Sequence, residues 1–149
     1  MNSKYDLFSD ALLSLVKSWR SALDARFRPF GLSQARWQVL LKLLRASEPL
    51  TQCDLAQRVG IEPASLVRLL DALQQEGLIV READPQDRRS KRISLTPSGL
   101  SLSRSLGAVA DQLREEVLGS LSESELSQCT GVLEQLRVRL ANLIEDGSE

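Results

Sequence analysis

Histidine is absent from this chain of 149 residues. Its imidazole is the most common general base near neutral pH and the most common zinc ligand, so its absence argues against both kinds of chemistry. A glycine-rich phosphate loop and a Gly-x-Ser-x-Gly elbow are missing as well. We therefore expect no catalytic residue, no metal site and no cofactor, and we predict that the protein is not an enzyme.

Cysteine and long apolar runs are also scarce. Cys53 and Cys129 are the two cysteines, and they are too few and too far apart in sequence to indicate a disulfide framework. Lys4, Asp6 and Asp10 interrupt the start of the chain, and no apolar run approaches the length that spans a bilayer. We therefore expect a cytoplasmic protein with reduced thiols and no membrane partner.

Aromatic residues make up only 4% of the chain and leucine dominates the apolar set, which favours helices over a sandwich of sheets. The length suits one domain, and small domains often gain stability by dimerising. Residues 1–32 and 33–99 each carry a net charge of +2, whereas residues 100–149 carry −5. An anionic partner would therefore meet the first two-thirds of the chain, with the acidic last third turned away.

A helix is predicted from Pro63 to Glu76, because proline suits a first helical turn and Gly77 suits the position just past the end. Its apolar stripe consists of Leu66, Leu69, Leu70 and Leu73. Another face consists of Ser65, Arg68 and Ala72. Small side chains with one arginine fit a DNA major groove, where arginine pairs with guanine; the alternative is that Arg68 is an ordinary solvated charge.

Two short strands are predicted at Leu78–Glu82 and Arg92–Leu95, and the loop between them, Asp84–Lys91, is rich in proline, aspartate and arginine. A hairpin with cations at its tip can reach a DNA minor groove. A helix followed by such a hairpin is the winged-helix arrangement. We expect Asp87 to orient Arg88 through a charge-assisted pair, the alternative being a solubilising charged turn.

Upstream of these elements, Ser33 is a candidate N-cap for a second helix, Gln34–Arg45, and Leu50 is expected to add a short strand to the hairpin. The side chains of this helix that are predicted to face inward are Trp37, Leu40, Leu41 and Leu44.

Thr51 is the expected N-cap of a third helix, Gln52–Val59, with Asp54 at the capping-box position and Gly60 at the end. Residues 51–77 therefore have the proportions of a helix-turn-helix, in which the second helix reads DNA and the first braces it.

Longer helices are predicted at Tyr5–Phe27, Pro97–Leu118 and residues 123–144. Thr96 caps the second of these, and Ser122 with Glu125 forms a capping box for the third. The apolar face of the second consists of Leu102, Leu106, Val109, Leu113 and Val117. One chain of this size buries little of such surface, so we expect a homodimer whose two reading helices enter successive major grooves of a near-palindrome.

The run from Asp84 to Gly99 resembles the wing of the multiple antibiotic resistance regulator (MarR) family, which has an aspartate, an arginine, a strand ending in Leu-Thr, and a glycine. Residues 61–73, with Trp19-Arg20, Leu23-Asp24 and residues 32–37, are similar to the SlyA branch of that family. The resemblance covers roughly residues 7–143.

The resemblance implies a mainly α fold with a small β-hairpin wing (α+β), formed by one MarR-type domain over residues 1–149. Its winged helix-turn-helix DNA-binding lobe would span residues 33–96, and its dimerisation helices residues 5–28 and 97–144. The implied function is sequence-specific binding of double-stranded DNA by a transcriptional regulator, commonly a repressor. The sequence leaves open whether transcription is repressed, activated or relieved of silencing.

The predicted DNA-binding residues combine the residue patterns with the resemblance. Ser65 and Arg68 would read base edges and Arg88 would enter the minor groove. The phosphate contacts would be Thr51, Gln52, Arg89, Lys91 and Arg92. The remaining residues of the predicted interface are Pro63, Ala64 and Asp87.

The family also commonly binds small aromatic or phenolic anions beside the DNA-binding lobe, and some members sense oxidants through a cysteine in the first helix. Candidate ligand-binding residues here are Trp19, Arg20, Arg36 and Trp37. The alternative is that both tryptophans are core and both arginines are surface. Cys53 lies near a helix N-terminus, but Asp54 disfavours a thiolate there. A thiol-sensing regulator and a winged-helix protein-interaction module remain alternative functions.

Overall fold

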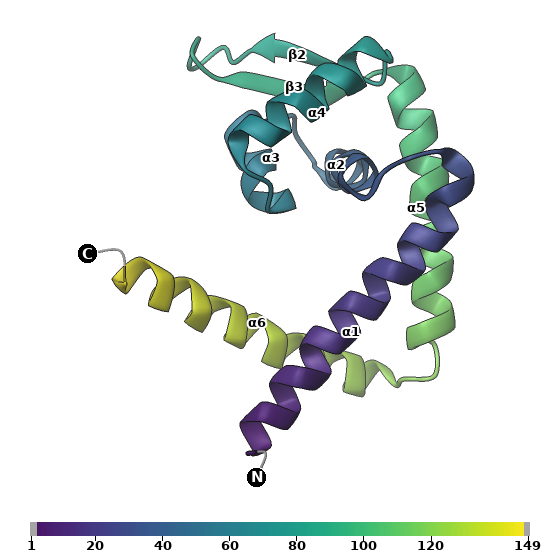
Figure 1. Ribbon diagram of the computed structural model, residues 1–149, viewed down its shortest axis with the longest axis vertical. Coiled ribbons are helices and arrows are strands. Elements are labelled where there is room, and N and C mark those ends of the chain that lie inside the picture. The colour runs from purple at the N-terminus through teal and green to yellow at the C-terminus, as the bar shows by residue number, and fades with distance from the viewer. Residues whose placement is uncertain (1–2, 148–149) are drawn as a thin grey trace. The chain divides into compact units, whose positions relative to one another are not determined.

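The computed structural model describes residues 3–147. The elements are α1 (Lys4–Phe27), a 3-10 turn η1 (Arg28–Phe30), α2 (Gln34–Arg45), β1 (Leu50–Thr51), α3 (Gln52–Val59), α4 (Pro63–Gln75), β2 (Ile79–Ala83), β3 (Lys91–Leu95), α5 (Pro97–Leu118) and α6 (Glu123–Asp146) (Figure 1). This mainly helical fold with a small antiparallel sheet is the predicted fold class.

The chain divides into two compact units, residues 1–112 and 113–149. The first unit contains a leucine-rich core. Its most deeply buried large side chains include Phe27, Leu40, Leu55, Leu66, Leu70, Leu73, Ile79, Ile93 and Leu106. These residues come from α1, α2, α3, α4, the sheet and α5, so the helix-turn-helix and the wing share one core.

Short-range signals set the helix ends. Gly60 and Gly77 adopt φ of 72° and 73°, the left-handed backbone that ends a helix. The Thr51 hydroxyl accepts a hydrogen bond from the Asp54 N–H at 3.1 Å and caps α3. Ser33 occupies the N-cap position of α2, but its side chain makes no capping hydrogen bond. The N-cap predicted at Ser33 is therefore confirmed in position, without a side-chain hydrogen bond.

The three strands lie in the order β1, β3, β2, and both pairs are antiparallel. Ile93 of β3 lies between Leu50 of β1 and Arg81 of β2. The hairpin was predicted to begin at Leu78, but β2 begins one residue later. Leu78 instead closes the turn after α4, because its N–H donates to the Leu73 carbonyl and its own carbonyl accepts from the Thr96 N–H.

The buried side of α5 differs from the predicted apolar face. Ser103, Leu106 and Ala110 are buried, whereas Leu102 and Val109 are half-buried and Val117 is 45% exposed. The physical reason is close approach at glycines. A Cβ on Gly99 would lie 1.9 Å from the Leu78 carbonyl oxygen, and one on Gly107 would lie 3.1 Å from a Leu44 methyl group. Small residues therefore form much of the buried side of α5, whereas the apolar pattern alone predicted that its valines would be buried.

The inward face of α2 was also predicted only in part. Trp37, Leu40 and Leu41 are buried as expected, whereas Leu44 is half-buried, and the additional buried side chains of α2 are Val39 and Leu43. A helix enclosed by other elements buries more than one stripe. None of the helices described between residues 3 and 147 combines the length and the apolar character needed to cross a membrane.

In the second unit, α6 begins with the predicted capping box. The Ser122 hydroxyl accepts from the Glu125 N–H at 3.1 Å, and the Glu125 carboxylate accepts from the Ser122 N–H at 3.0 Å. Among the side chains of α6 that the structure describes, Leu126 and Leu136 are half-buried and the others are exposed. The exposed large apolar side chains of α6 are Val132, Leu133, Val138, Leu140, Leu143 and Ile144.

Candidate nucleic-acid interface

The helix α4 presents an open N-terminal half. Pro63, Ala64, Ser65 and Arg68 are exposed. On the other side, Leu66, Leu70 and Leu73 are 0% exposed and hold the helix on the core. Leu69 and Ala72 are half-buried, and on the second half of α4 the exposed side chains are those of Asp71, Gln74 and Gln75. Small side chains and one long cation on a firmly seated helix are suited to close approach to base edges.

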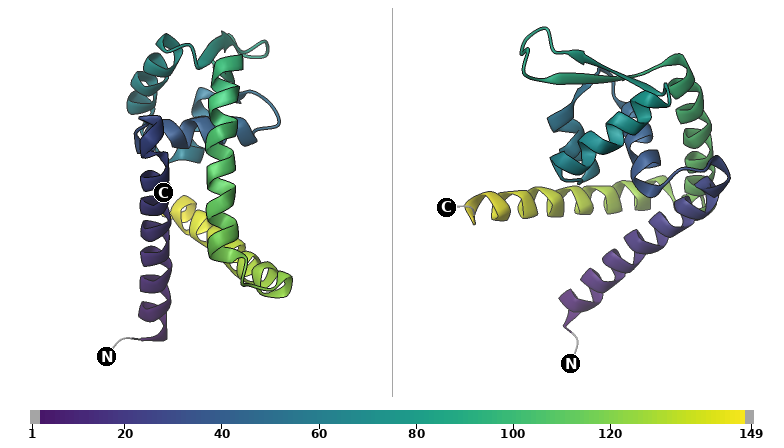
Figure 2. Two further views of the ribbon diagram at one scale, coloured as in Figure 1. Left: turned by 90° about the vertical axis from the view of Figure 1, so that its right-hand side faces the viewer. Right: turned by 45° about the horizontal axis from the view of Figure 1, so that its top comes forward.

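The wing is the hairpin of β2 and β3 with the loop of residues 84–90, and it projects beyond α3 and α4 (Figure 1, Figure 2). The Asp84 N–H donates to the Ser90 carbonyl and closes the loop at 3.0 Å. Inside it, Asp87 accepts the Ser90 N–H on its carbonyl and the Arg89 N–H on its carboxylate, each at 3.0 Å. Asp87 thereby folds a turn that leaves Arg88 and Arg89 exposed.

The carboxylate pairing in the wing differs from the one predicted. Asp87 bonds the backbone of Arg89, and the arginine held by a carboxylate is Arg92, whose Nε lies 3.1 Å from Oδ1 of Asp84. Asp84 is only 7% exposed and also accepts the Gln86 N–H at 3.0 Å. The reason is position: Asp84 sits at the closed base of the loop beside β3, whereas Asp87 sits at its exposed tip. No pattern in the sequence indicated which of the two aspartates would be buried.

A groove of about 180 Å³ joins α3, α4 and the wing. Its lining residues are Gln52, Cys53, Ala56, Pro63, Arg89, Ser90 and Lys91. Three predicted phosphate contacts, Gln52, Arg89 and Lys91, therefore share one concave surface, although α3 and the wing are far apart in sequence. Thr51 lies half-buried at the start of α3. Two cations beside the N-terminus of a helix favour an anion.

Two ion pairs hold the C-terminal half of α4, and sequence reasoning missed both. Nη2 of Arg36, on α2, lies 2.7 Å from Oε1 of Glu76, the C-cap of α4. On β2, Arg81 pairs through Nη2 with Oδ1 of Asp71 at 2.5 Å. Its Nε donates to Oε1 of Gln74 at 2.7 Å. The sequence did contain a signal for the second pair: Asp71 and Gln74 lie three residues apart on α4, and Arg81 follows shortly after the turn that ends the helix.

The four predicted ligand-binding residues lie in different surroundings. Trp37 is 4% exposed, its Nε1 donates to Oδ1 of Asp24 at 2.8 Å, and its ring centroid lies 5.0 Å from that of Phe27. The Arg36 guanidinium is engaged by Glu76, and Trp19 is half-buried on α1. Trp37 is therefore a core residue, which is the alternative reading given above for the tryptophans.

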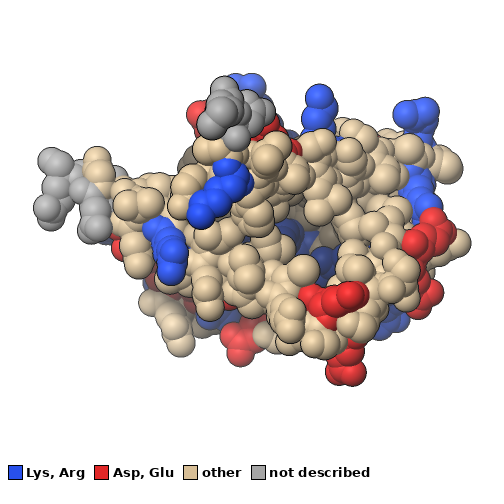
Figure 3. Space-filling model, turned by 90° about the horizontal axis from the view of Figure 1, so that it is seen from below, with Lys and Arg blue, Asp and Glu red and all other residues tan. Residues whose placement is uncertain are grey.

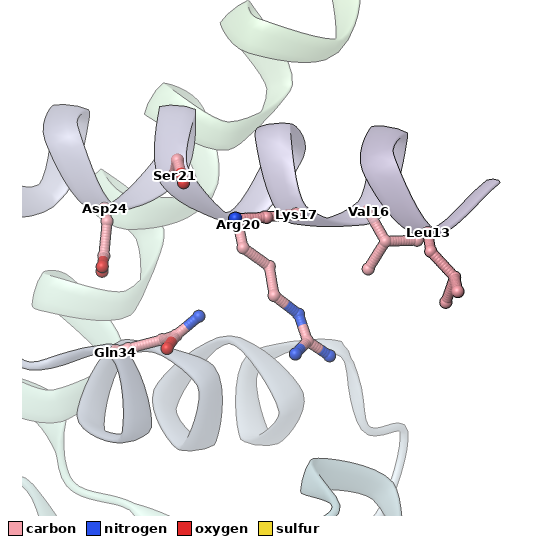
Figure 4. A pocket seen from close by; sticks show the side chains of 7 residues that line it. All are labelled: Leu13, Val16, Lys17, Arg20, Ser21, Asp24 and Gln34. Carbon is pink, nitrogen blue, oxygen red and sulfur yellow. The ribbon is translucent and has the colours of Figure 1, made fainter. Parts of the chain in front are cut away.

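Of the four predicted ligand-binding residues, Arg20 is the one that lines a cavity of about 400 Å³ on α1. The lining residues are Leu13, Val16, Lys17, Arg20, Ser21, Asp24 and Gln34 (Figure 4). Figure 4 shows the Arg20 side chain extending from α1 toward α2, from which Gln34 points back. Lys17 was missed, although its position three residues before Arg20 places both cations on one helix face.

A helix-turn-helix with an open reading face, followed by a hairpin with exposed arginines, defines the class of winged-helix DNA-binding proteins. The comparisons agree. Residues 32–91 match the model of the MarR family. The chain is 44% identical to the crystal structure of the transcriptional regulator PA3341, over 91% of this chain and 98% of that one, with a TM-score of 0.85. The chain belongs to the MarR family.

Two further solved structures extend the likeness. MepR of S. aureus, in its DNA-binding conformation, is 26% identical over 89% of this chain and 98% of that chain, with a TM-score of 0.82. CouR of Rhodococcus jostii RHA1, bound to p-coumaroyl-CoA, is 26% identical over 91% and 95%, with a TM-score of 0.79. The protein is thus a DNA-binding transcriptional regulator, and members of its family are generally regulators without enzymatic activity.

Proposed function

We propose that this regulator binds near-palindromic DNA sites as a homodimer, with α4 of each subunit in a major groove and each wing in the adjacent minor groove. The observation that carries the proposal is the exposed first half of α4, seated on three fully buried leucines and flanked by the groove that contains Gln52, Arg89 and Lys91. Because residues 61–73 are similar to the SlyA branch of the family, we also propose that the protein belongs to that branch.

Each predicted residue has a role in this proposal. Ser65 and Arg68 read base edges, and Pro63 and Ala64 are small enough to let α4 approach them. Arg88 enters the minor groove from the turn that Asp87 shapes. The phosphate contacts are Thr51, Gln52, Arg89, Lys91 and Arg92. Arg92 makes the weakest of these, because Asp84 already neutralises much of its charge.

The homodimer is supported by apolar side chains that a single chain leaves in solvent. On α1, Leu7, Leu13 and Leu15 are 61%, 67% and 57% exposed. On α6, Leu133, Leu140 and Leu143 are 45%, 61% and 68% exposed and share one helix face. Uncharged side chains predominate on the face shown in Figure 3. Apolar surface of this extent marks an interface, and a second copy of the chain is the partner that the two-fold symmetry of a palindrome requires.

The cavity on α1 is the proposed site of a small aromatic acid that modulates DNA binding. Lys17 and Arg20 supply positive charge for a carboxylate, and Leu13 and Val16 supply an apolar wall for a ring. Support for an aromatic ligand comes from CouR, whose crystal structure is bound to p-coumaroyl-CoA; that ligand shares the phenolic ring with p-coumarate and carries a thioester in place of the carboxylate. Arg20→Ala should abolish release of DNA by p-coumarate while leaving DNA affinity unchanged in its absence, as a fluorescence titration would measure.

The DNA-binding proposal is tested by a titration over a range of salt concentrations. The probes are a duplex selected by the wild-type protein from a random pool and a scrambled duplex of equal length. Arg88→Ala should cost about 1–3 kcal/mol on the selected duplex, whereas Lys91→Ala should mainly lower the salt slope, by about 1. Arg139→Ala, on the acidic α6, is the control and should change neither. Equal, weak binding to both duplexes would favour the protein-interaction alternative.

A further inference from the structure

Arg81 holds the reading helix from the side of the wing. Its Nη2 pairs with Oδ1 of Asp71 at 2.5 Å and its Nε donates to Oε1 of Gln74 at 2.7 Å. The side chain of Arg81 is 21% exposed and that of Asp71 is 58% exposed. One planar guanidinium thus binds two side chains almost one turn apart on α4, a fork that a flexible point charge such as lysine does not reproduce.

The buried leucines and this polar fork constrain α4 in different ways. Apolar burial is non-directional, so Leu66, Leu70 and Leu73 hold the helix on the core and tolerate small rotations about its axis. Hydrogen bonds weaken steeply when their angles change, so the fork opposes such rotation. Asp71 lies three residues after Arg68 on α4, and Arg81 lies on β2, the first strand of the wing. The fork therefore links the reading face of α4 to the wing.

We propose that Arg81 is a positioning residue for DNA recognition. Through Asp71 and Gln74 it sets the rotation of α4 relative to the wing, so that Arg68 and Arg88 address the major groove and the adjacent minor groove in one register. The proposal rests on the reading role of α4 proposed above. Its rival is that Arg81 is an additional phosphate contact, with Asp71 as a neighbouring surface charge.

The positioning role and the phosphate-contact role predict opposite effects on DNA affinity when Asp71 is changed. Asp71→Asn removes a negative charge from the helix that faces DNA, so simple electrostatics predicts tighter binding. If Asp71 instead positions the helix through Arg81, the same change weakens binding. The salt dependence provides a second distinction, because loss of a phosphate contact lowers the salt slope by about 0.9 whereas loss of positioning leaves it unchanged.

The experiment compares wild type, Arg81→Met, Asp71→Asn and the double variant by fluorescence anisotropy on the selected and scrambled duplexes. Each single variant should weaken binding to the selected duplex about tenfold, the size of one lost base contact, and binding to the scrambled duplex less than about twofold. The double variant should be no weaker than the singles, because both remove the same link. The salt slope should remain that of the wild type.

Arg137→Met is the matched control. Arg137 makes the same kind of fork, with Nε 3.0 Å and Nη2 2.6 Å from the two Glu134 carboxylate oxygens, but within α6. It should leave both affinities unchanged. Arg81→Lys keeps the charge and should lose affinity by an intermediate factor. Circular dichroism melts identify the temperatures at which each variant is folded, and affinities are compared only there. Asp71→Asn is the substitution expected to disturb folding least, because the position is exposed.

Tighter binding by Asp71→Asn, or a lower salt slope in Arg81→Met, overturns the positioning role in favour of a phosphate contact. Additive losses in the double variant also overturn it. Arg68→Ala separates the two proposals: if it leaves affinity for the selected duplex unchanged, the reading role of α4 fails and the inference fails with it. If Arg68→Ala weakens binding and Asp71→Asn does not, only the role of Arg81 is lost.

Discussion

The helices α4 and α6 both carry a leucine stripe, yet they use it differently. Leu66, Leu70 and Leu73 of α4 are 0% exposed, whereas Leu140 and Leu143 of α6 are 61% and 68% exposed. Both stripes follow helical spacing, so amphipathic pattern alone does not say whether a face is covered by its own chain or by another. The DNA-binding lobe closes its core within one chain, and we attribute the open face of α6 to a second copy.

Negative charges placed on the exposed leucine face of α6 test most directly whether a second copy covers that face. Leu133→Glu combined with Leu140→Glu should raise the dimer dissociation constant at least about a hundredfold, because a buried, unpaired carboxylate costs several kcal/mol. Light scattering on the eluting peak measures the molar mass, against a chain mass of 16.5 kDa. Val138→Glu, on the opposite face of α6, is the control and should stay dimeric. A wild-type protein at the chain mass would contradict the dimer.

The closed core of the lobe should respond to a cavity within a single chain. Leu70→Ala removes a side chain that is 0% exposed, and the expected loss is about 2–5 kcal/mol of the free energy of unfolding. Urea denaturation followed by circular dichroism measures it. Leu143→Ala on α6 should cost less when the protein is diluted to monomer, since its side chain is then already in water. Equal costs under those conditions would remove the distinction between the two helices.

Within the lobe, the buried and exposed aspartates of the wing allow a finer comparison. Asp84→Ala leaves the Gln86 N–H and Arg92 without their acceptor, which should destabilise the wing by about 1–3 kcal/mol. Hydrogen exchange of the amides of residue 84 and residues 86–90 should then accelerate. Asp87→Ala removes a bond from an exposed position and should accelerate exchange less. If Asp87→Ala has the larger effect, Asp84 is not the residue that closes the loop.

The smallest effect is expected at the exposed ion pair of α6. Hydrogen bonds from Arg137, followed by its positive charge, hold the pKa of the Glu134 carboxyl below its ordinary value of 4.5. Because the folded-state pKa is lowered, the pair's stabilisation is present above about pH 4.5 and is lost as the pH falls through the folded-state value. Full solvent exposure keeps that stabilisation small. Carboxyl NMR titration should show Arg137→Met returning the Glu134 pKa toward 4.5, with little change in Tm at pH 7.

Much of the local structure could be predicted from the sequence. Thr51, Gly60, Gly77 and the pair of Ser122 and Glu125 mark helix ends in the structure where the sequence placed them. Such signals act over a few residues, because a cap or a left-handed glycine satisfies groups in its own turn. The hairpin was predictable for the same reason, apart from shifts of one residue at both ends of β2 and at the start of β3.

Partnerships between elements could not be predicted in this way. Arg36 was predicted to be a ligand-binding cation, yet it pairs with Glu76, forty residues further on. Trp37 was predicted both to face inward and to line a ligand site, and its partners in the core, Asp24 and Phe27, come from α1. Lys17 lines the cavity on α1 beside Arg20, although the sequence pattern did not single it out. Each of these outcomes depends on which helix packs beside which.

The sequence by itself determined the order and approximate limits of the helices and the wing hairpin, because these follow from backbone preferences and periodicity along the chain. Only the tertiary structure decided which cations remain exposed. Arg68 and Arg88 face solvent, whereas Arg36, Arg81 and Arg92 are paired with carboxylates. The physical reason is that an ion pair needs two side chains within about 4 Å, and only packing of distant segments sets that distance.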